Sequence, residues 1–584
     1  MSFTARLSPA RVSAKAAVAF PRWALVVLLV IYIAAGLFGR DPWGSEDAAA
    51  FGVMWSMARG DLSAWLLPVL AGEWYAQEGP LAFWVGALFI QLLGDWLGAP
   101  LAARMSTVLS FALTTTALWY GTYALARRDA AQPVTFAFGG EAAPRDYGRM
   151  LADIAVLLLL GTVGLVLRMH ETSAETAALA WTAVALFGIA WSQDRPMAGA
   201  WIAGIAIGAA ALSRGPWFGA WVLAGGLVAL RFTVPTPNRI AALSASAAAA
   251  MGVFALWPLA TLLAPESARS LYWTAYLGWL ERSMALPSLG DLGWVPKNGA
   301  WFTWPLWPLV FWAIYAWRHL LPTAHIAVPL ALAGTLLLAL LCTHPVNNGL
   351  LVPLVGPLVV LATFGAASLK RSLDDLIDWF AIATFSLFAL ATWAYFVAWH
   401  AGAPRAMATS VRRLIPGFDG GPGVLELLLA GAATLLWLVL IGWRLLRRPP
   451  MLWTGPLLGA CGLTMLWLLV TTLFLAAVNY NRTYRPLAEQ VTHEIRRHVA
   501  SGAAPTCVLP LRLNAGHRAM FEYFGGVDFG HPARPQDCKL LLQRDSRRSV
   551  LDDGLPPGDW RLLWTGSWPA RPDEVIRLYR HGGG

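Results

Sequence analysis

Apolar stretches of about 15 to 26 residues recur along the chain, and short segments that carry the charges separate them. A helix of about 20 apolar residues is long enough to cross the hydrocarbon core of a bilayer. Only 13% of the 584 residues are charged and 57% are hydrophobic, whereas soluble domains are about 25% charged. The sequence therefore predicts a polytopic α-helical membrane protein and excludes a chain of soluble domains.

Thirteen membrane spans are expected from the apolar runs and the basic loops between them. The run from Leu81 to Leu97 is assigned to a helix on the outer surface, because this keeps most basic loops on the cytoplasmic side. Arg405, Arg412 and Arg413 fall on the outer side against that trend. The expected spans are about 23–39, 101–126, 150–168, 175–192, 199–213, 215–231, 240–263, 301–317, 325–343, 349–368, 377–399, 423–445 and 453–478.

The first span has a basic flank and no convincing cleavage site after it, so it is expected to stay in the protein as an uncleaved span. The flank places the N-terminus in the cytoplasm. The expected organisation is a basic N-terminus, a transmembrane domain with two long outer loops, and an outer C-terminal domain. These parts cover residues 1–22, residues 23–478 with loops 40–100 and 264–300, and residues 479–584.

The C-terminal segment alternates short apolar runs with turn residues, which is typical of a small α/β domain. Helices are expected at about 486–499 and 516–524, and strands at about 507–511, 538–542, 560–564 and 575–579. Cys507 and Cys538 both lie here and are candidates for a disulfide in an oxidising compartment, with the alternative of free thiols left open. Cys342 and Cys461 lie in or near spans and are expected to be buried thiols.

Ionisable residues from distant parts of the chain are expected to meet on the outer face. Such groups are costly near a membrane and tend to face one another or a cavity. Taken singly, the acids are ordinary helix-start residues, the bases are snorkelling helix ends, and the histidines are surface residues. Together they indicate an anionic substrate, while the scattered Lys and Arg residues, despite a net charge of +10, give no sign of a nucleic-acid partner. The set is Glu46, Asp47, Glu78, Arg104, His170, Glu171, Glu175, Arg214, Glu281, Arg282, Lys297 and His344.

Several motifs resemble lipid-linked-sugar glycosyltransferases of the GT-C fold, in the branch of aminoarabinose transferases and protein mannosyltransferases. These motifs are the acidic pair after the first span, "GDLSAWLLPVLAGEWYAQEGPLAFW", an Arg in the next span, "LSRGP" and "HPVNNGLLVPLVGP". They lie within residues 20 to 360. The resemblance implies a polyprenyl-phosphate sugar donor and an acceptor that is a lipid A-like glycolipid, another glycan or a protein. It also implies transfer at the periplasmic face of a bacterial inner membrane, by a protein expected to be a monomer surrounded by membrane lipids.

By position in these motifs, Glu46 corresponds to the family's catalytic Asp and Asp47 to the Glu that follows it. Residues 78–80 fall on the family's Glu-Lys-Pro, and residues 214–216 on its Lys-Gly-Pro. Gly79 replaces a Lys, and residues 344–349 lack the usual basic and Tyr residues, so donor phosphate contacts are expected to differ. The catalytic candidates are Glu46, Asp47, Glu171 and Glu175, and the donor-phosphate candidates are Glu78, Arg104, Arg214, Arg282 and Lys297.

Three questions stay open at this point. Adjacent helical residues point about 100° apart, so one of Glu46 and Asp47 is expected to face the sugar and the other to orient it or hold a neighbouring base. No cofactor is certain, but some relatives hold a metal near the acidic loop, and Glu78 with His170 or His344 forms a candidate divalent-metal set. The alternative function is a transporter or flippase of lipid-linked sugars, although no internal repeat is evident.

Overall fold

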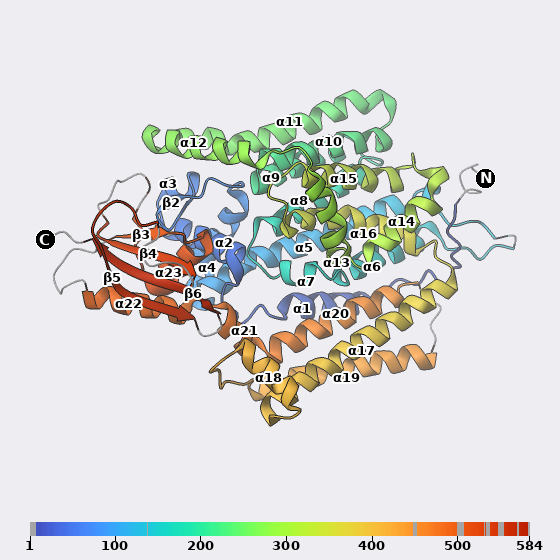
Figure 1. Cartoon of the computed structure of the whole chain (residues 1–584). Helices are drawn as coiled ribbons and strands as arrows, with labels where there is room; N and C mark the ends of the chain where they lie inside the picture. Colours follow the sequence, from blue (N-terminus) through green and yellow to red (C-terminus); the bar gives the residue numbers. More distant parts are fainter. Residues whose placement is uncertain are drawn as a thin grey trace.

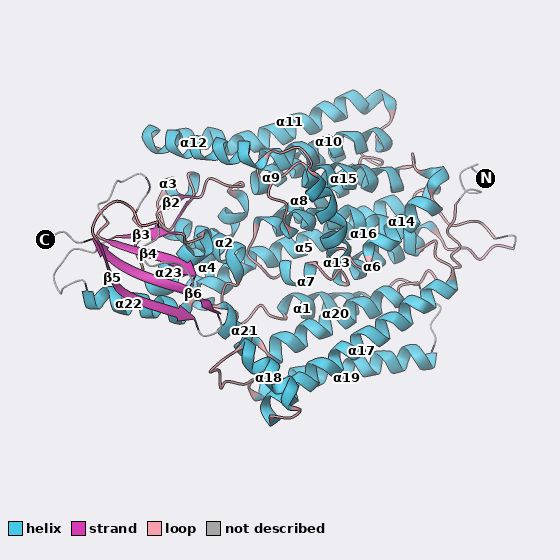
Figure 2. Ribbon diagram, in the orientation of Figure 1, coloured by secondary structure: helices cyan, strands magenta, loops and turns pink. Residues whose placement is uncertain are grey.

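The computed structural model describes residues 8–136, 138–447, 452–498, 507–530, 532, 538–546, 554–568 and 571–581. Most of these residues are helical, and a four-stranded sheet lies at one end of the helical bundle (Figure 1, Figure 2). The first seven residues of the basic N-terminal segment lie outside the described residues. The structure thus has the predicted architecture of a helical membrane domain with a small C-terminal α/β part.

In the described part of the chain, nine helical segments are long and apolar enough to cross a membrane. Three shorter apolar helices accompany them, α1 (Arg22–Ala34), α4 (Leu81–Leu97) and α14 (Leu306–Ala316). Each of the thirteen expected spans coincides with a helix, but α1, α6 (Pro144–Leu160), α10 (Pro216–Thr233) and α14 are not among the nine, so thirteen crossings stay a prediction. The nine are α5 (Ala99–Ala126), α8 (Ala174–Trp191), α9 (Pro196–Arg214), α11 (Thr236–Ala260, with the turn to Leu263), α15 (Ala324–Leu341), α16 (Val352–Ala366, with the preceding turn from Asn348), α17 (Arg371–Ala401), α19 (Val424–Arg447) and α20 (Thr454–Leu473).

The first of the two segments expected as long outer loops folds into several short elements on the side of the bundle that faces the sheet (Figure 1). It begins with α2 (Gly44–Arg59) and α3 (Leu62–Leu66), and continues with a small hairpin of β1 (Val69–Leu70) and β2 (Glu73–Trp74). Helix α4 follows over the residues expected for the surface helix, and it packs on both α2 and α5.

The second segment expected as a long outer loop consists of α12 (Glu266–Ser283) and α13 (Leu289–Phe302). Helix α12 follows α11, which ends in a short turn, and the end of α12 bridges to the residues after α15 through Met284 and Thr343. The loop that leads into α16 is thereby attached to α12. A short helix, α7 (Leu165–Arg168), lies between α6 and α8 in the chain.

The C-terminal part begins after α21 (Leu475–Arg482) and contains α22 (Arg485–His498) and α23 (Ala515–Gly525). Its sheet has the strand order β3-β4-β6-β5, in which β3 and β4 are parallel and the other neighbours are antiparallel. The strands are β3 (Val508–Leu511), β4 (Leu540–Ser546), β5 (Trp560–Trp568) and β6 (Arg571–His581), so all four expected strands and both expected helices are present.

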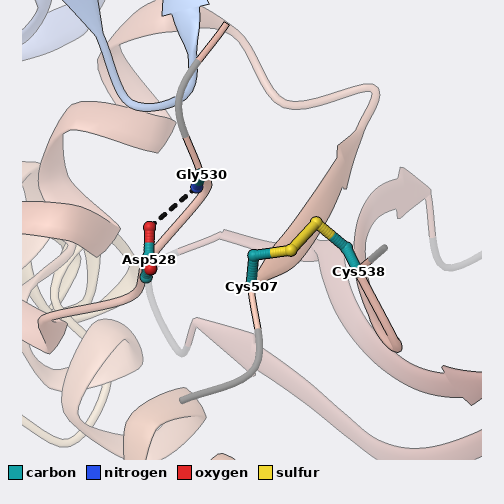
Figure 3. Close-up of a disulfide and its surroundings, with 4 residues drawn as sticks. All are labelled: Cys507, Asp528, Gly530 and Cys538. Atoms are coloured by element: carbon teal, nitrogen blue, oxygen red, sulfur yellow. Dashed lines mark hydrogen bonds between the residues drawn. A yellow bond between two sulfur atoms is a disulfide. The ribbon is translucent and has the colours of Figure 1, made fainter. Parts of the chain in front are cut away.

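A disulfide joins Cys507 and Cys538, with a Cα–Cα distance of 4.8 Å (Figure 3). It links the residue before β3 to the segment that enters β4. Cys342 and Cys461 are free and partly buried.

Helix α23 packs directly on α2, the helix that carries the acidic pair (Figure 1). The contact is close because Gly516 lies against Ser45 and Ala519 lies against Gly52, with no room for a larger side chain at either glycine. An ion pair between Arg518 and Glu73 attaches the same helix to the β1–β2 hairpin. The C-terminal part is therefore packed on α2 and attached to the β1–β2 hairpin.

Candidate active site

Helix α2 presents its two adjacent carboxylates in different environments. Both residues lie in its first turn, where the helix dipole stabilises negative charge. The Glu46 side chain is 46% exposed, whereas the Asp47 side chain is fully buried. This divergence follows from the angle of about 100° between successive helical residues.

Both carboxylate oxygens of Asp47 are occupied by groups from other segments. Oδ2 accepts hydrogen bonds from the Trp43 backbone N–H at 2.8 Å and from the Arg40 guanidinium at 3.1 Å. Oδ1 accepts from the backbone N–H and the hydroxyl of Thr172, at 2.8 and 2.7 Å. Although burial alone would raise the pKa of Asp47, Arg40, Arg104 and Thr172 hold it below its usual value. Asp47 therefore fastens the start of α2 to the loop after α7.

Arg104, a candidate phosphate ligand in the sequence analysis, is buried and supports the same structure. Its two terminal nitrogens donate to the carbonyl oxygens of Arg40 and Asp41, at 2.6 and 3.0 Å. Only 2% of the residue is exposed. The guanidinium is therefore enclosed by the loop that precedes α2, and we do not include Arg104 among the donor-phosphate ligands proposed below.

We expect Asp47→Asn to destabilise the protein strongly, because it leaves the buried Arg40 guanidinium without its counter-charge. Breaking a buried ion pair costs about 3 to 5 kcal/mol. Thermal unfolding of the purified protein in detergent, followed by tryptophan fluorescence, measures the effect. Asp95→Asn is the matched control, since Asp95 is exposed. An Asp47→Asn variant that unfolds at the temperature of the control would contradict this anchoring role.

Arg168 connects the exposed acid of α2 to a second carboxylate. Its Nη1 pairs with Glu46 and lies 3.0 Å from Oε2 of Glu171. The Glu171 side chain is only 8% exposed. Burial and the neighbouring charge of Asp47 raise the pKa of Glu171 to about 7, against the opposing effect of Arg168.

Arg214 connects two further carboxylates from different segments. Its Nη1 pairs with Glu78, in the loop before α4, and lies 2.8 Å from Oε1 of Glu175, in the first turn of α8. Burial raises the pKa of Glu78 to about 7, and the nearby charges of Glu175 and Glu46 add to the rise against the opposing effect of Arg214. The two clusters, Glu46–Arg168–Glu171 and Glu78–Arg214–Glu175, are therefore close enough for their charges to interact, and together we call them the acidic site.

The backbone at Glu78 has an unusual conformation. Its φ is 58°, a left-handed value that costs a non-glycine residue on the order of 1 kcal/mol. Gly79 comes next, and a Cβ there would lie 2.0 Å from the carbonyl oxygen of Leu212. The loop therefore passes so close to the end of α9 that the Lys of the family motif would clash at position 79. This close approach places Glu78 against Arg214.

The loop before α16 closes the acidic site from another direction. Gly349 packs against Glu175, where a Cβ would meet Oε1 at 2.4 Å. The elements that adjoin this loop carry four exposed residues from the candidate set, Glu281 and Arg282 at the end of α12, Lys297 in α13 and His344 after α15. The His344 backbone N–H donates to the Ser283 carbonyl at 2.9 Å. No ion pair forms at Arg282 or Lys297 within the part of the chain that the structure describes.

The candidate metal set does not come together. Both ring nitrogens of His170 face backbone carbonyl oxygens, of Val166 at 2.5 Å and Tyr32 at 2.9 Å, and burial lowers the pKa of this imidazole to about 4. Glu78 is paired with Arg214, while His344 is exposed. Among the described residues no three His, Cys, Asp or Glu side chains form a group that could hold a metal ion. Glu78, His170 and His344 therefore do not form one ligand set in the described structure.

An apolar hollow of about 400 Å³ adjoins the acidic site. Its walls come from the start of α10, the end of α11 and one face of α12. Pro216 and Tyr276 line it on the side of Gly215, the residue that follows Arg214, and the Tyr276 hydroxyl lies 3.5 Å from where a Cβ of Gly215 would be. The hollow thus reaches to within two residues of Arg214 along the chain.

Four residues of this region were not identified as site residues from the sequence. Arg40 and Thr172 bind Asp47, Arg168 binds Glu46, and Tyr75 lies close to Glu78, whose charge together with burial raises the pKa of the Tyr75 hydroxyl. Arg168 was assigned to the end of a span, and no local pattern marks Thr172 or Tyr75. Arg40 is directly visible in the sequence as a basic residue that follows the first span on the outer side, against the trend of the other loops.

Several solved structures have a fold similar to that of this chain. The crystal structure of ArnT from Cupriavidus metallidurans bound to undecaprenyl phosphate matches with a TM-score of 0.61 and 16% identity, over 95% of this chain and 98% of that one. The apo form of the same protein matches with a TM-score of 0.61, 15% identity and coverages of 95% and 97%. The archaeal oligosaccharyltransferase AglB from Archaeoglobus fulgidus, in complex with an inhibitory peptide and a dolichol-phosphate, has a TM-score of 0.44, 12% identity and coverages of 89% and 69%.

No family model matches the sequence, and no curated protein matches it either. The likeness to ArnT extends over nearly the whole of both chains and confirms the fold that the sequence motifs predicted. Because the match covers 95% of the chain, it extends beyond the helical domain into the C-terminal part.

Proposed function

We propose that this protein is an integral membrane glycosyltransferase that moves a sugar from a polyprenyl-phosphate donor to an acceptor, at the periplasmic face of a bacterial inner membrane. The observation that carries the proposal is the acidic site, which brings together an exposed carboxylate and two arginines, and has the apolar hollow two residues along the chain from Arg214. The fold shared with ArnT, which was crystallised with undecaprenyl phosphate, supports the same conclusion.

The donor is assigned to this site by its chemistry. A polyprenyl-phosphate sugar has an isoprenoid tail, a phosphate and a sugar in that order, and the site offers an apolar hollow, guanidinium groups and a carboxylate. Both contacts of Arg214 with carboxylates use Nη1, so its fork retains N–H groups for a phosphate oxygen. Arg282 and Lys297 supply further positive charge from α12 and α13 at the rim. The hollow is assigned to the first isoprene units of the tail.

Glu46 is assigned as the general base. Its side chain is accessible, whereas Asp47 is enclosed and serves to position the helix start. A base must come within hydrogen-bonding distance of the proton that it removes, which only an accessible carboxylate can do. The acceptor hydroxyl or phosphate oxygen loses its proton to Glu46 and attacks the anomeric carbon of the sugar.

In the same step the bond between the anomeric carbon and the phosphate oxygen breaks, and polyprenyl phosphate leaves with the electron pair. Arg214, and Arg168 beside the base, stabilise the negative charge on the departing phosphate. One displacement without a covalent intermediate inverts the anomeric configuration. Glu171 and Glu175 hold the two arginines in place, which is a positioning role rather than the catalytic role that the sequence analysis considered.

The envelope of cells with and without the protein tests this function. Mass analysis of extracted glycolipids and glycoproteins should show one sugar-modified species that disappears when the gene is removed and returns with the wild-type chain. We expect the unmodified acceptor and the donor lipid to accumulate together. Identical envelopes in cells that express and lack the protein would contradict the proposal.

A further inference from the structure

Helix α18 (Arg405–Leu414) lies between the two spanning helices α17 and α19, on the same side of the bundle as the C-terminal sheet (Figure 1). Two hydrogen bonds attach it to α21, which leads into the C-terminal part. The Asn481 side chain donates to the Leu414 carbonyl at 2.6 Å, and the Tyr480 hydroxyl donates to the Pro416 carbonyl at 2.8 Å. The helix therefore lies where α17 and α19 leave the membrane.

The residues of α18 separate into a basic face and an apolar face. At about 100° per residue, Arg405, Arg412 and Arg413 lie within one arc of the helix, and Met407, Val411 and Leu414 lie on the opposite side. All three arginines are exposed, while Met407 and Val411 are partly buried. Val411 packs against the cluster of Trp399, Ile415 and Ala477. The apolar face thus holds the helix on the bundle and turns the arginines outward.

Arg482, the last residue of α21, adds a fourth cation beside the end of α18. It is exposed, and its neighbour Asn481 bonds Leu414. Within the described residues none of these four arginines forms an ion pair, in contrast to Arg168, Arg214 and Arg518 on the same side of the bundle. We call Arg405, Arg412, Arg413 and Arg482 the α18 patch.

The α18 patch contradicts the usual distribution of charge in a membrane protein, since its arginines follow a span on the side that the basic loops assign to the outside. An amphipathic helix with a basic face at a membrane boundary is typical of contact with anionic headgroups. Arginine binds phosphate through two parallel hydrogen bonds, which an exposed side chain without an internal partner is free to form.

We propose that the α18 patch binds the phosphate headgroups of anionic lipids in the leaflet next to the C-terminal part. The lipid is held by its headgroup on the basic face, while its acyl chains lie against the exposed apolar surfaces of α17 and α19. This contact is independent of the acidic site, and it explains why a basic helix is present on this side of the membrane.

The test measures lipid binding by the full-length protein, delipidated in a neutral detergent. The protein is titrated with phosphatidylglycerol, with phosphatidylcholine and with glycerol phosphate, and bound lipid is counted by native mass spectrometry. We expect phosphatidylglycerol to bind in preference to the other two. The variant Arg405→Gln/Arg412→Gln/Arg413→Gln should bind it at least about tenfold more weakly, because each surface arginine near an anionic lipid contributes about a factor of five.

The matched control is the variant Arg195→Gln/Arg231→Gln/Lys370→Gln. It removes the same number of positive charges, at three exposed residues on the opposite side of the bundle. The control should bind phosphatidylglycerol like the wild type. Equal binding by the α18 variant and the wild type, or an equal loss in the control, would overturn the proposal. Tight binding of glycerol phosphate alone would also overturn it, since the ligand would then be a free anion rather than a lipid.

Discussion

Glu46→Gln should reduce sugar transfer from a polyprenyl-phosphate donor by about two to four orders of magnitude, the usual contribution of a general base. The amide keeps the size of the side chain but cannot accept the proton of the acceptor. Because 46% of the Glu46 side chain is exposed, the protein should fold and insert normally. Product formation per molecule of purified protein is the measurement, with thermal unfolding as the check on folding.

Glu489→Gln is the matched control for this prediction, because Glu489 is an exposed acid on α22 outside the acidic site. It should retain wild-type activity. A Glu46→Gln variant with full activity would exclude this residue as the base. Glu78, whose pKa is raised to about 7, would then be the next candidate among the partly accessible carboxylates of the site.

Arg214→Gln should have two separate effects, one on stability and one on the donor. It leaves the partly buried Glu78 and the buried Glu175 as neighbouring acids without their shared cation, which costs about 3 to 5 kcal/mol. It also removes the guanidinium assigned to the donor phosphate, so donor affinity should fall by at least about tenfold, the factor that corresponds to one charge-assisted hydrogen bond of about 1.5 kcal/mol. Thermal unfolding and equilibrium binding of polyprenyl phosphate measure the two effects.

The double variant Arg214→Gln/Glu78→Gln separates these effects. It removes one of the two unpaired acids, so part of the lost stability should return, but the phosphate ligand is still missing and donor affinity should stay low. If the folded double variant binds polyprenyl phosphate like the wild type, Arg214 does not contact the donor, and Arg282 and Lys297 become the first alternatives.

The helical bundle and the C-terminal sheet were predictable because their signals are local. Apolar runs mark the helices, and alternating short runs with turn residues mark the four strands. The number of membrane crossings was harder to predict from the sequence. Helices α1 and α14 have only 13 and 11 residues, so their lengths alone do not show whether they cross the membrane.

The acidic site was predictable in all its members except Arg168, but not in its pairings. Glu46, Glu78, Glu175 and Arg214 were all identified, because ionisable residues near a membrane are rare enough to stand out. The roles of Asp47 and Arg104 were not accessible, because both depend on partners that only the fold brings near. Asp47 bonds Thr172, which is 125 positions away, and Arg104 bonds Arg40, which is 64 positions away.

The α18 patch illustrates how an exception to a sequence rule can be informative. Arg405, Arg412 and Arg413 contradicted the charge distribution used to assign the spans, and the structure retains them on the side of the C-terminal sheet. The exception did not disturb the assignment of α17 and α19, because the hydropathy of those two helices is high enough to identify them alone.

Sugar transfer in a purified system tests the central claim most directly. The wild-type protein, reconstituted in lipid, is incubated with a polyprenyl-phosphate sugar and an extract of envelope acceptors, and free polyprenyl phosphate and modified acceptor are quantified by mass spectrometry. We predict that both products form in equal amounts with the wild type and with Glu489→Gln, and that neither forms at a comparable rate with Glu46→Gln. Movement of the intact donor across the bilayer without release of polyprenyl phosphate would contradict the account and identify the protein as a transporter.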